Sequence, residues 1–453
     1  MRTLILAALL AAAPQAALWA APLSGDQAAL HVLNRLSYGP RPGDVQHVRQ
    51  VGVQAYIEEQ LNPPPLPQAL AQRLDALDTL KLSAGEALAR FQEARDAKDG
   101  ARREVVAKMA SEAMEARLMR AIESPRQLEE VMVDFWFNHF NVFSGKGQDR
   151  ALVASYERDA IRPYVFGNFR QLLGATAHHP AMLFYLDNWV SKAGGLNENY
   201  ARELMELHTL GVDNGYTQKD VTELARMLTG WTYAPQRDAQ FKFDAKRHDN
   251  GYKTWLGKSI PPRGQAEGEY ALDVLAVHPA TARHVSWQLA QYFVADQPPA
   301  SMVERMAQTW SATRGDIRAV LRTMFASQEF MDQAYAGAKF KTPYRYVVSA
   351  SRAADLPMSD VKPLAGTLAR LGMPLYGCQT PDGYKNTEEA WLNPDGLSRR
   401  IAYAIALGAA ADAATVQGAL GPLVTPRTAE IVADSNERLR AAMLLGSPDF
   451  MQH

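Results

Sequence analysis

The sequence predicts a mainly α-helical fold: a single large multi-helical domain with one small β-hairpin and a long N-terminal helical hairpin. Apolar residues recur at helical spacing through most of the chain, and short loops separate these segments. Among the 453 residues, 47% are hydrophobic and 21% are charged, which are values typical of a globular protein. No sequence period is repeated along the chain, which argues against a solenoid.

The first residues predict export. A short basic start, Met1 to Thr3, precedes a nearly unbroken apolar run at residues 4–18, and small residues follow it. This pattern is typical of a secretory signal peptide, which we place at residues 1–21. A membrane anchor or a buried helix is the alternative, but the run is shorter than the ~20 residues that span a bilayer, and Pro14 interrupts it. We therefore expect a mature protein at residues 22–453 that is periplasmic or extracellular and has no stable membrane span.

Charge and cysteine content exclude several classes of protein. The chain has 48 basic and 49 acidic side chains and a net charge of −1, with no basic arm, so we expect no nucleic-acid partner. Its one cysteine, Cys378, excludes an intramolecular disulfide and any zinc or iron–sulfur site built from several cysteines.

In chain order, the first helical patterns cover residues 27–36 and 42–61. A long charged stretch then predicts the helical hairpin at residues 84–124, which we interpret as a solvated pair of helices packed on the body. A mobile lid over a site is the alternative. Further helical patterns lie at residues 127–140, 152–164, 169–177, 199–210, 218–231, 270–275, 281–294, 301–311, 317–326, 343–354, 361–371 and 398–407.

Local signals refine two of these elements. Thr217 and Asp220 stand at the spacing of a capping box, with an aspartate where Glu or Gln is preferred. The alternating run Phe241–Phe243 leads through Asp249, Asn250 and Gly251 into residues 253–256. This arrangement predicts the β-hairpin.

The densest polar cluster lies at residues 196–211. On a helix, Asn199, Arg202, Glu203 and Glu206 fall on one stripe. Two carboxylates, a guanidinium and an amide form a plausible site for a metal or a polar substrate, and equally a solvated helix face. The aromatic segments at 136–140 and 185–189 contain isolated polar groups that need buried partners, which favours a site.

Other polar residues occur in suggestive places. Asn138 and His139 interrupt an aromatic run, where a histidine is more often a core residue than a ligand, and Asp187 interrupts a second run. His248 and Asp249 precede the predicted turn, and Lys253 follows it. Motifs for zinc proteases, dinucleotides, phosphate-binding loops and serine hydrolases are absent from the sequence.

Several of these strings resemble an exported bacterial family, the domain of unknown function 1800. They lie at residues 33–40, 135–140, 197–211, 221–231, 248–253, 278–282 and 380–384, and the resemblance runs from about Ala28 to about Leu407. It implies a mostly helical, exported protein, encoded in many cases beside a secreted protein similar to sulfatases and alkaline phosphatases. Family members usually have Gly-Trp where this chain has Gly383 and Tyr384. The resemblance brings no assigned reaction.

We expect an exported hydrolase that acts on an envelope or imported polymer such as a saccharide. The expected catalytic residues are Glu203, Glu206, His139, His248 and Asp249, and the expected substrate-binding residues are Arg202, Lys253, Asn138, Asn199 and Asp187. A divalent metal ion held by His139, Glu203 and His248 is the cofactor to test for. The first alternative is a non-catalytic periplasmic partner or maturation factor of the sulfatase-like protein, and a metal-dependent oxidoreductase ranks last.

Overall fold

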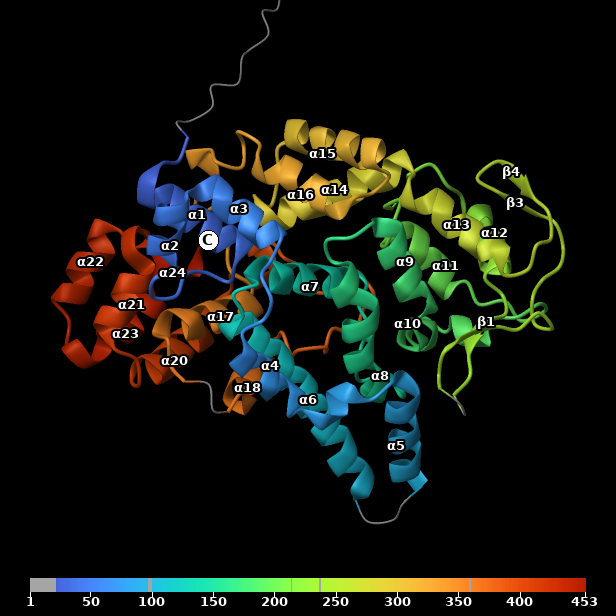
Figure 1. The fold of residues 1–453 in the computed structure, drawn as a ribbon, viewed down its shortest axis with the longest axis horizontal. Helices are drawn as coiled ribbons and strands as arrows, with labels where there is room; N and C mark the ends of the chain where they lie inside the picture. Colours follow the sequence, from blue (N-terminus) through green and yellow to red (C-terminus); the bar gives the residue numbers. More distant parts are fainter. Residues whose placement is uncertain (1–21, 97–99, 213, 236–237, 358–359) are drawn as a thin grey trace, which may run out of the picture.

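The computed structural model describes residues 22–96, 100–212, 214–235, 238–357 and 360–453. The predicted signal segment at residues 1–21 therefore lies outside the described residues. Figure 1 shows the fold, which is mainly α-helical as predicted. No helix in these described ranges combines the length and the apolar character needed to cross a membrane.

The described N-terminal part supplies four short α-helices, one 3-10 turn and the predicted hairpin. The short elements are α1 (Gly25–Leu36), α2 (Asp44–Val51), α3 (Val53–Leu61), α4 (Gln68–Asp75) and η1 (Asp78–Lys81). The hairpin consists of α5 (Ala84–Asp96) and α6 (Ala101–Glu123), and it projects from the body at the bottom of Figure 1. The apolar stripe of α6 is buried at Met109, Leu118 and Ile122, which explains how this charged helix packs on the body.

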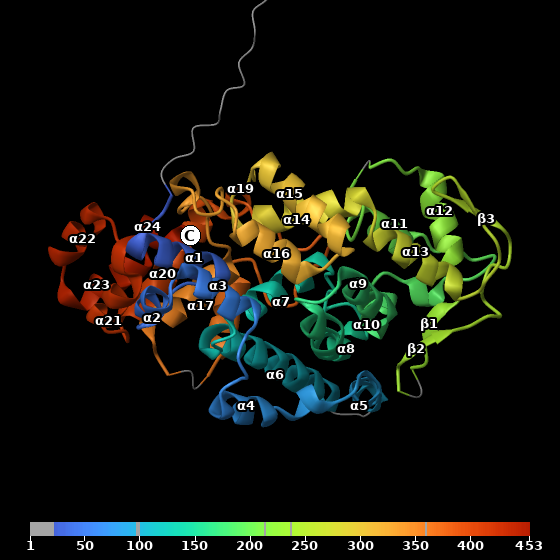
Figure 2. The same cartoon turned by 45° about the horizontal axis from the view of Figure 1, so that its top comes forward.

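The middle of the chain forms the centre and one end of the molecule. Its elements are α7 (Gln127–His139), α8 (Asp149–Ser155), the π-helical turn η2 (Tyr156–Ile161), η3 (Arg162–Tyr164), α9 (Phe169–His178), α10 (Pro180–Tyr185), η4 (Asn188–Val190), α11 (Asn199–Glu206) and α12 (Gln218–Met227). The predicted capping box begins α12: the Thr217 side chain accepts from the Asp220 amide, and the Asp220 carboxylate accepts from the Thr217 amide. Figure 2 shows α11 and α12 at the end that also carries the strands.

The predicted hairpin pairing is wrong. Phe241–Phe243 (β2) does not pair with the segment after the Asp-Asn-Gly turn but with Trp231–Tyr233 (β1). Lys253–Trp255 (β3) pairs instead with Lys258–Ile260 (β4), so two separate two-stranded antiparallel sheets form. The physical reason lies between the two segments, because His248 and Asp249 are held by α12 and α13 and do not form a two-residue turn.

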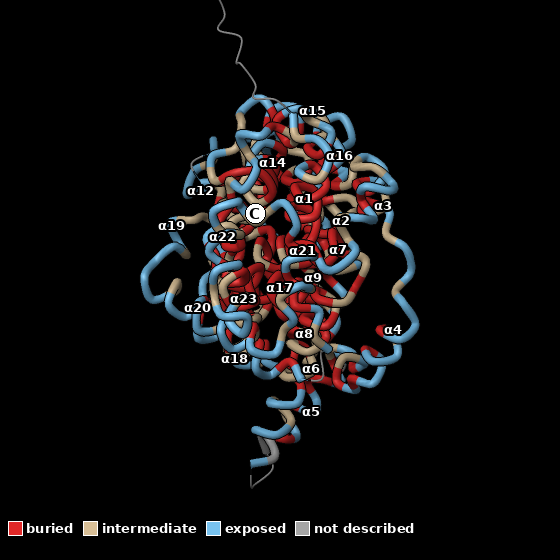
Figure 3. The backbone as a smooth tube through the Cα atoms, turned by 90° about the vertical axis from the view of Figure 1, so that its left-hand side faces the viewer, coloured by how far each residue is buried: buried red, intermediate tan, exposed pale blue. Residues whose placement is uncertain are grey.

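The C-terminal part returns to the N-terminal helices. It contains α13 (Ala266–Ala276), α14 (Pro279–Phe293), α15 (Ala300–Thr313), α16 (Ile317–Phe325), η5 (Gln333–Tyr335), α17 (Pro343–Ala354), α18 (Lys362–Arg370), α19 (Glu388–Trp391), α20 (Pro394–Gly408), α21 (Ala413–Leu420), η6 (Gly421–Leu423), α22 (Pro426–Ala433), α23 (Glu437–Leu445) and α24 (Pro448–Met451). The tube coloured by burial shows α17 in the interior, and every residue of α17 is buried (Figure 3).

A continuous apolar core joins these parts. It contains buried side chains from Ala29 in α1 to Met451 in α24, and it surrounds Trp136 and Phe140 on or beside α7. Because α7 crosses this core, the polar residues on or just after α7 contact partners from distant segments of the chain.

Candidate functional site

The loop at residues 376–384 is held in place by polar side chains from α7, from the segment just after it and from α10. The Asn138 side chain donates to the Tyr384 carbonyl at 2.9 Å and accepts from the Tyr384 amide at 2.7 Å. The Asn141 amide donates to the carbonyls of Cys378 and Thr380 at 3.0 and 2.8 Å. Both ends of the Asn138 amide are therefore used by the fold, and the predicted substrate-binding role of Asn138 gains no support.

Gly383 is required where this loop passes α7. Its φ is +67°, and a Cβ atom there would lie only 2.4 Å from the Asn138 carbonyl oxygen. The left-handed conformation and the close approach both favour glycine. The loop therefore has one defined position against α7, and this position sets where the neighbouring Asp382 lies.

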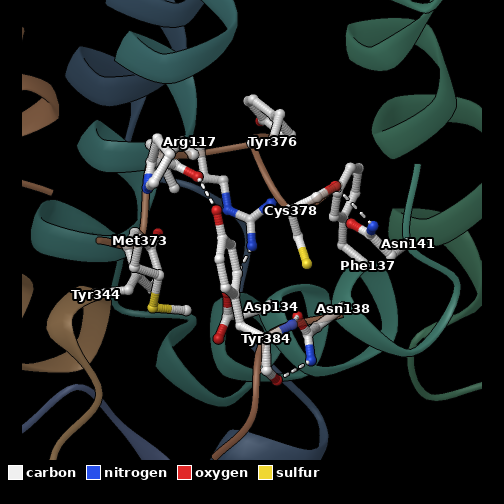
Figure 4. Close-up of a pocket in the computed structure, with 13 residues that line it drawn as sticks. Arg117, Asp134, Phe137, Asn138, Asn141, Tyr344, Met373, Tyr376, Cys378 and Tyr384 are labelled. Atoms are coloured by element: carbon white, nitrogen blue, oxygen red, sulfur yellow. Dashed lines mark hydrogen bonds and ion pairs between the residues drawn. The ribbon is translucent and has the colours of Figure 1, made fainter. Parts of the chain in front are cut away.

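Beneath the loop is a small cavity around Arg117, Asp134, Asn138, Asn141 and Cys378 (Figure 4). Arg117 donates to Asp134 at 2.6 Å and to Glu157, in the π-helical turn η2, at 3.1 Å. Burial alone would raise the pKa of Glu157, but Arg117 and Arg162 lower it to about 2. The cavity leaves only about 20 Å³ for the centre of a water molecule, so its paired charges hold the fold together and leave no room for a substrate.

A second polar group faces the same loop from α11. Glu203 is half-buried, and no described residue donates a hydrogen bond to its carboxylate. Burial raises the pKa of Glu203, Glu206 and Asp382 raise it further, and Arg202 opposes them. Arg202 itself lies 3.4 Å from both Glu198 and Glu206 and donates to Gln218 at 2.9 Å, so its charge is shared along the helix surface.

Asp382, in the loop at 376–384, is a carboxylate near enough to Glu203 to contribute to the rise of its pKa. Burial alone would raise the pKa of Asp382, but hydrogen bonds from Lys385 and Thr380 lower it below its usual value. The Lys385 ammonium lies 2.7 Å from the Asp382 carboxylate. The pKa of Glu203 is thus raised and that of Asp382 is lowered, which is the usual arrangement of an acid and a base in one site.

Tyr185 lies at the edge of this site. Its hydroxyl donates to the Gln379 carbonyl at 2.8 Å, and burial is the main cause that raises its pKa, with smaller contributions from Cys378 and Glu203. Glu203, Glu206, Asp382 and Tyr185 together form what we call the acidic site. Its polar residues come from α10, α11 and the loop at 376–384.

The predicted histidines are not part of the acidic site. His139 is buried, its Nε2 lies 3.1 Å from the His208 carbonyl, and its ring stacks on Phe135. Burial, with a smaller contribution from His284, lowers the pKa of His139 to about 3. It is therefore a neutral core histidine, and its burial among aromatic rings leaves it no access to a substrate.

His248 belongs to a separate buried cluster at the strand end of the molecule. Its Nε2 lies 3.1 Å from Glu267, whose other oxygen lies 2.6 Å from the Lys253 ammonium, and all three side chains are 0% exposed. Asp249 pairs with Arg226 at 2.8 Å, and that hydrogen bond is the main cause that lowers the pKa of Asp249 to about 2. These contacts join α12, β3 and α13, so His248, Asp249 and Lys253 hold elements together.

The other two predicted residues are Asp187 and Asn199. Asp187 accepts from Lys146 at 2.9 Å just after α10, and Asn199 is the first residue of α11. The predicted metal-binding set of His139, Glu203 and His248 is not assembled. Among the described residues, no three His, Cys, Asp or Glu side chains are close enough to hold a metal ion. Of the five expected catalytic residues, the structure brings together Glu203 and Glu206.

Sequence reasoning did not select Asp382 or Tyr185. Asp382 stands in Thr-Pro-Asp-Gly-Tyr, which is one of the strings that carry the family resemblance, so a signal was present. Tyr185 precedes Asp187 in an aromatic segment and looks like an ordinary core residue. Their distance from Glu203 in sequence hid the relation that the fold creates.

These features define a mainly α-helical protein with a half-buried acidic site beside an anchored loop. Over residues 31–452 the chain matches the family described as Protein of unknown function (DUF1800), and it belongs to that family. The family resemblance read from the sequence is thereby confirmed. No curated protein and no solved structure matches the chain.

Proposed function

We propose that the protein is a hydrolase in which Glu203 is the general acid and Asp382 the ionised general base or nucleophile. The opposite displacement of their pKa values is the observation that carries this proposal. A protonated carboxyl donates to the leaving group while an ionised one activates water or attacks directly. Glu206 assists by raising the pKa of Glu203.

An envelope or imported polymer such as a saccharide is the proposed substrate class. Glycoside hydrolysis is a reaction that two carboxyl groups of unequal pKa perform without a cofactor. The acidic site has three carboxyl groups and disfavours a polyanion, so a neutral polymer is the better fit. Arg202 and Asp187 remain the candidate substrate-binding side chains, because both are part-exposed.

The test is to incubate the protein with a panel of soluble neutral polysaccharides and to measure hydrolysis as the release of reducing ends. We expect Glu203→Gln and Asp382→Asn each to lower kcat by about 100-fold or more. Glu430→Gln, which changes an exposed carboxylate on α22, is the control and should leave kcat unchanged. The pH profile should be bell-shaped, with Asp382 governing the acid limb and Glu203 the alkaline limb. Full activity in both site variants would refute the assignment.

A second candidate function is the non-catalytic partner or maturation factor of the sulfatase-like protein. Its support is that Asn138, His139, His248 and Lys253, all in family strings, serve the fold. Co-expression tests it. If the sulfatase-like protein gains activity only with this chain present, and Glu203→Gln still supports that gain, the partner function replaces hydrolysis.

Export is part of the proposal. Its support is the pattern of the first 21 residues in the sequence. Secreted or periplasmic material should begin close to residue 22 when its N-terminus is sequenced. Material outside the cytoplasm that still begins at Met1 would contradict a cleaved signal.

A further inference from the structure

A cavity of about 190 Å³ lies at the base of the α5–α6 hairpin, between η1, α6 and the π-helical turn η2. Its apolar wall includes Leu74, Ala113 and Ala116. Its polar lining is dominated by cations, which are Lys81, Arg120, Arg158 and Arg162, against the carboxylates Asp75 and Glu157. Figures 1 and 2 show α4 and α6 lying side by side at this base.

The buried carboxylates beside this cavity, Glu157 and Glu130, already have partners, whereas Asp75 is exposed to solvent. Glu157 accepts from Arg162 at 2.8 Å, from Arg117 at 3.1 Å and from the Tyr376 hydroxyl at 2.8 Å. Glu130 accepts from Arg162 at 2.7 Å. Three cations of the lining are also engaged. Arg162 binds both glutamates, Arg158 donates to the carbonyls of Leu80 and Leu82, and the exposed Lys81 lies 3.9 Å from Asp78.

Arg120 is different from its neighbours. Its guanidinium is partly buried, and it makes no hydrogen bond and no ion pair with any described residue. Burial lowers the pKa of Arg120, and the nearby Arg162 lowers it further, whereas Glu130 and Glu157 oppose the shift from a distance. Withdrawing a guanidinium from water without a counter-ion is costly, so its position calls for an anion.

We propose that this cavity binds an oxyanion, a phosphate or sulfate group, with Arg120 as its principal ligand. A guanidinium forms paired hydrogen bonds with the oxygens of such groups, and Lys81 adds a flexible positive charge at the rim. The oxyanion is either a free inorganic ion or the acidic group of a larger molecule. The site is separate from the acidic site, and the proposal stands whether or not hydrolysis is the protein's function.

The experiment is calorimetric titration of the full chain with sodium phosphate and sodium sulfate, compared with sodium chloride at equal ionic strength. We expect saturable binding of phosphate or sulfate and none of chloride. Arg120→Met should weaken binding at least tenfold, whereas Arg103→Met, an exposed arginine on the same helix, should leave it unchanged. Titration with glucose 6-phosphate distinguishes a free inorganic ion from the acidic group of a larger molecule. Tighter binding than that of inorganic phosphate indicates a larger ligand, and equal binding indicates the free ion.

Stability without ligand provides the second readout. Because Arg120 has no partner to lose among the described residues, Arg120→Met should unfold at the same temperature as the parent protein or higher. Arg120→Lys keeps the charge and should retain weakened binding. The proposal is overturned if phosphate and sulfate bind no better than chloride, if Arg103→Met loses as much affinity as Arg120→Met, or if Arg120→Met is strongly destabilised in the absence of anion.

Discussion

Asp149, the first residue of α8, has a buried carboxyl group to which no described residue donates a hydrogen bond. Its side chain is fully buried, and neither carboxylate oxygen has a hydrogen-bond partner among the residues that the structure describes. Burial raises the pKa of Asp149 well above its usual value, Asp187 adds to the shift, and Lys146 opposes it. A buried carboxyl of this kind costs less when it is protonated, so the folded state holds its proton to higher pH than the unfolded state does.

Stability should therefore fall as pH rises. Below about pH 4 the carboxyl is protonated in both states, and above that the unfolded state releases the proton first. We expect Asp149→Asn, which is neutral at every pH, to stabilise the protein at pH 8 by on the order of 1 kcal/mol or more and to have little effect at pH 4. Urea unfolding at both pH values measures this. Equal effects at pH 4 and pH 8 would show that Asp149 does not carry the dependence.

For Glu203 we expect the opposite: a substitution should change activity and leave stability nearly unchanged. Its carboxylate has no hydrogen-bonding partner among the described residues, and burial, with a smaller contribution from Glu206, raises its pKa. Glu203→Gln keeps the shape and removes one negative charge, so the free energy of unfolding should change by less than about 0.5 kcal/mol. Thermal unfolding beside the activity assay separates the two roles. A large loss of stability would make Glu203 part of the architecture.

At the scale of elements, the cluster of His248, Lys253 and Glu267 attaches β3 to α13. The Glu267 carboxylate also accepts from the amides of Arg263 and Gly264, and these hydrogen bonds, with those from Lys253 and His248, outweigh burial and lower the pKa of Glu267. A carboxylate with this many donors inside the protein fixes the segments that supply them.

Removing the Lys253 ammonium should destabilise the protein, because the Glu267 carboxylate stays buried. Lys253→Met leaves the Glu267 carboxylate buried without its ammonium partner, so we expect a loss of about 3–5 kcal/mol in the free energy of unfolding. Lys258→Met is the matched control, because Lys258 lies on the paired strand β4 and is exposed. Urea unfolding of both variants gives the comparison, and similar stabilities for the two would rule out a structural role for the cluster.

Helices were predictable from the sequence because their signals are local. The apolar spacing of α6 and the capping box of α12 are written in neighbouring residues, and the structure confirms both. The pairing of the strands was not predictable from the sequence. Strands of three residues carry little information on their partners, and the contact of His248 with Glu267 prevents the expected turn. The acidic site was half predictable for the same reason: Glu203 and Glu206 share one helix, whereas Asp382 meets them only through the fold.

At the scale of the whole molecule, the first described helix, α1, packs against segments from the last third of the chain. Arg345 of α17 donates to the carbonyls of Asn34 and Ser37 at 2.8 and 2.7 Å, and its guanidinium lies over the rings of Tyr38 and Tyr292. Arg35 donates in turn to the Tyr335 carbonyl. These contacts join residues about 300 positions apart, so the packing of α1 on α17 depends on long-range contacts across the chain.

Arg345→Met tests that dependence. The change leaves two buried carbonyl groups at the end of α1 without donors, each at a cost of about 1–3 kcal/mol. Because α1 and α17 share one core, we expect both to lose protection against hydrogen exchange together, and the thermal transition to stay single while moving to lower temperature. Arg399→Met, an exposed arginine on α20 paired only with Asp395, should change neither. If α1 alone lost protection while α17 kept it, the N-terminal helices would be a separately unfolding unit attached to an independent core.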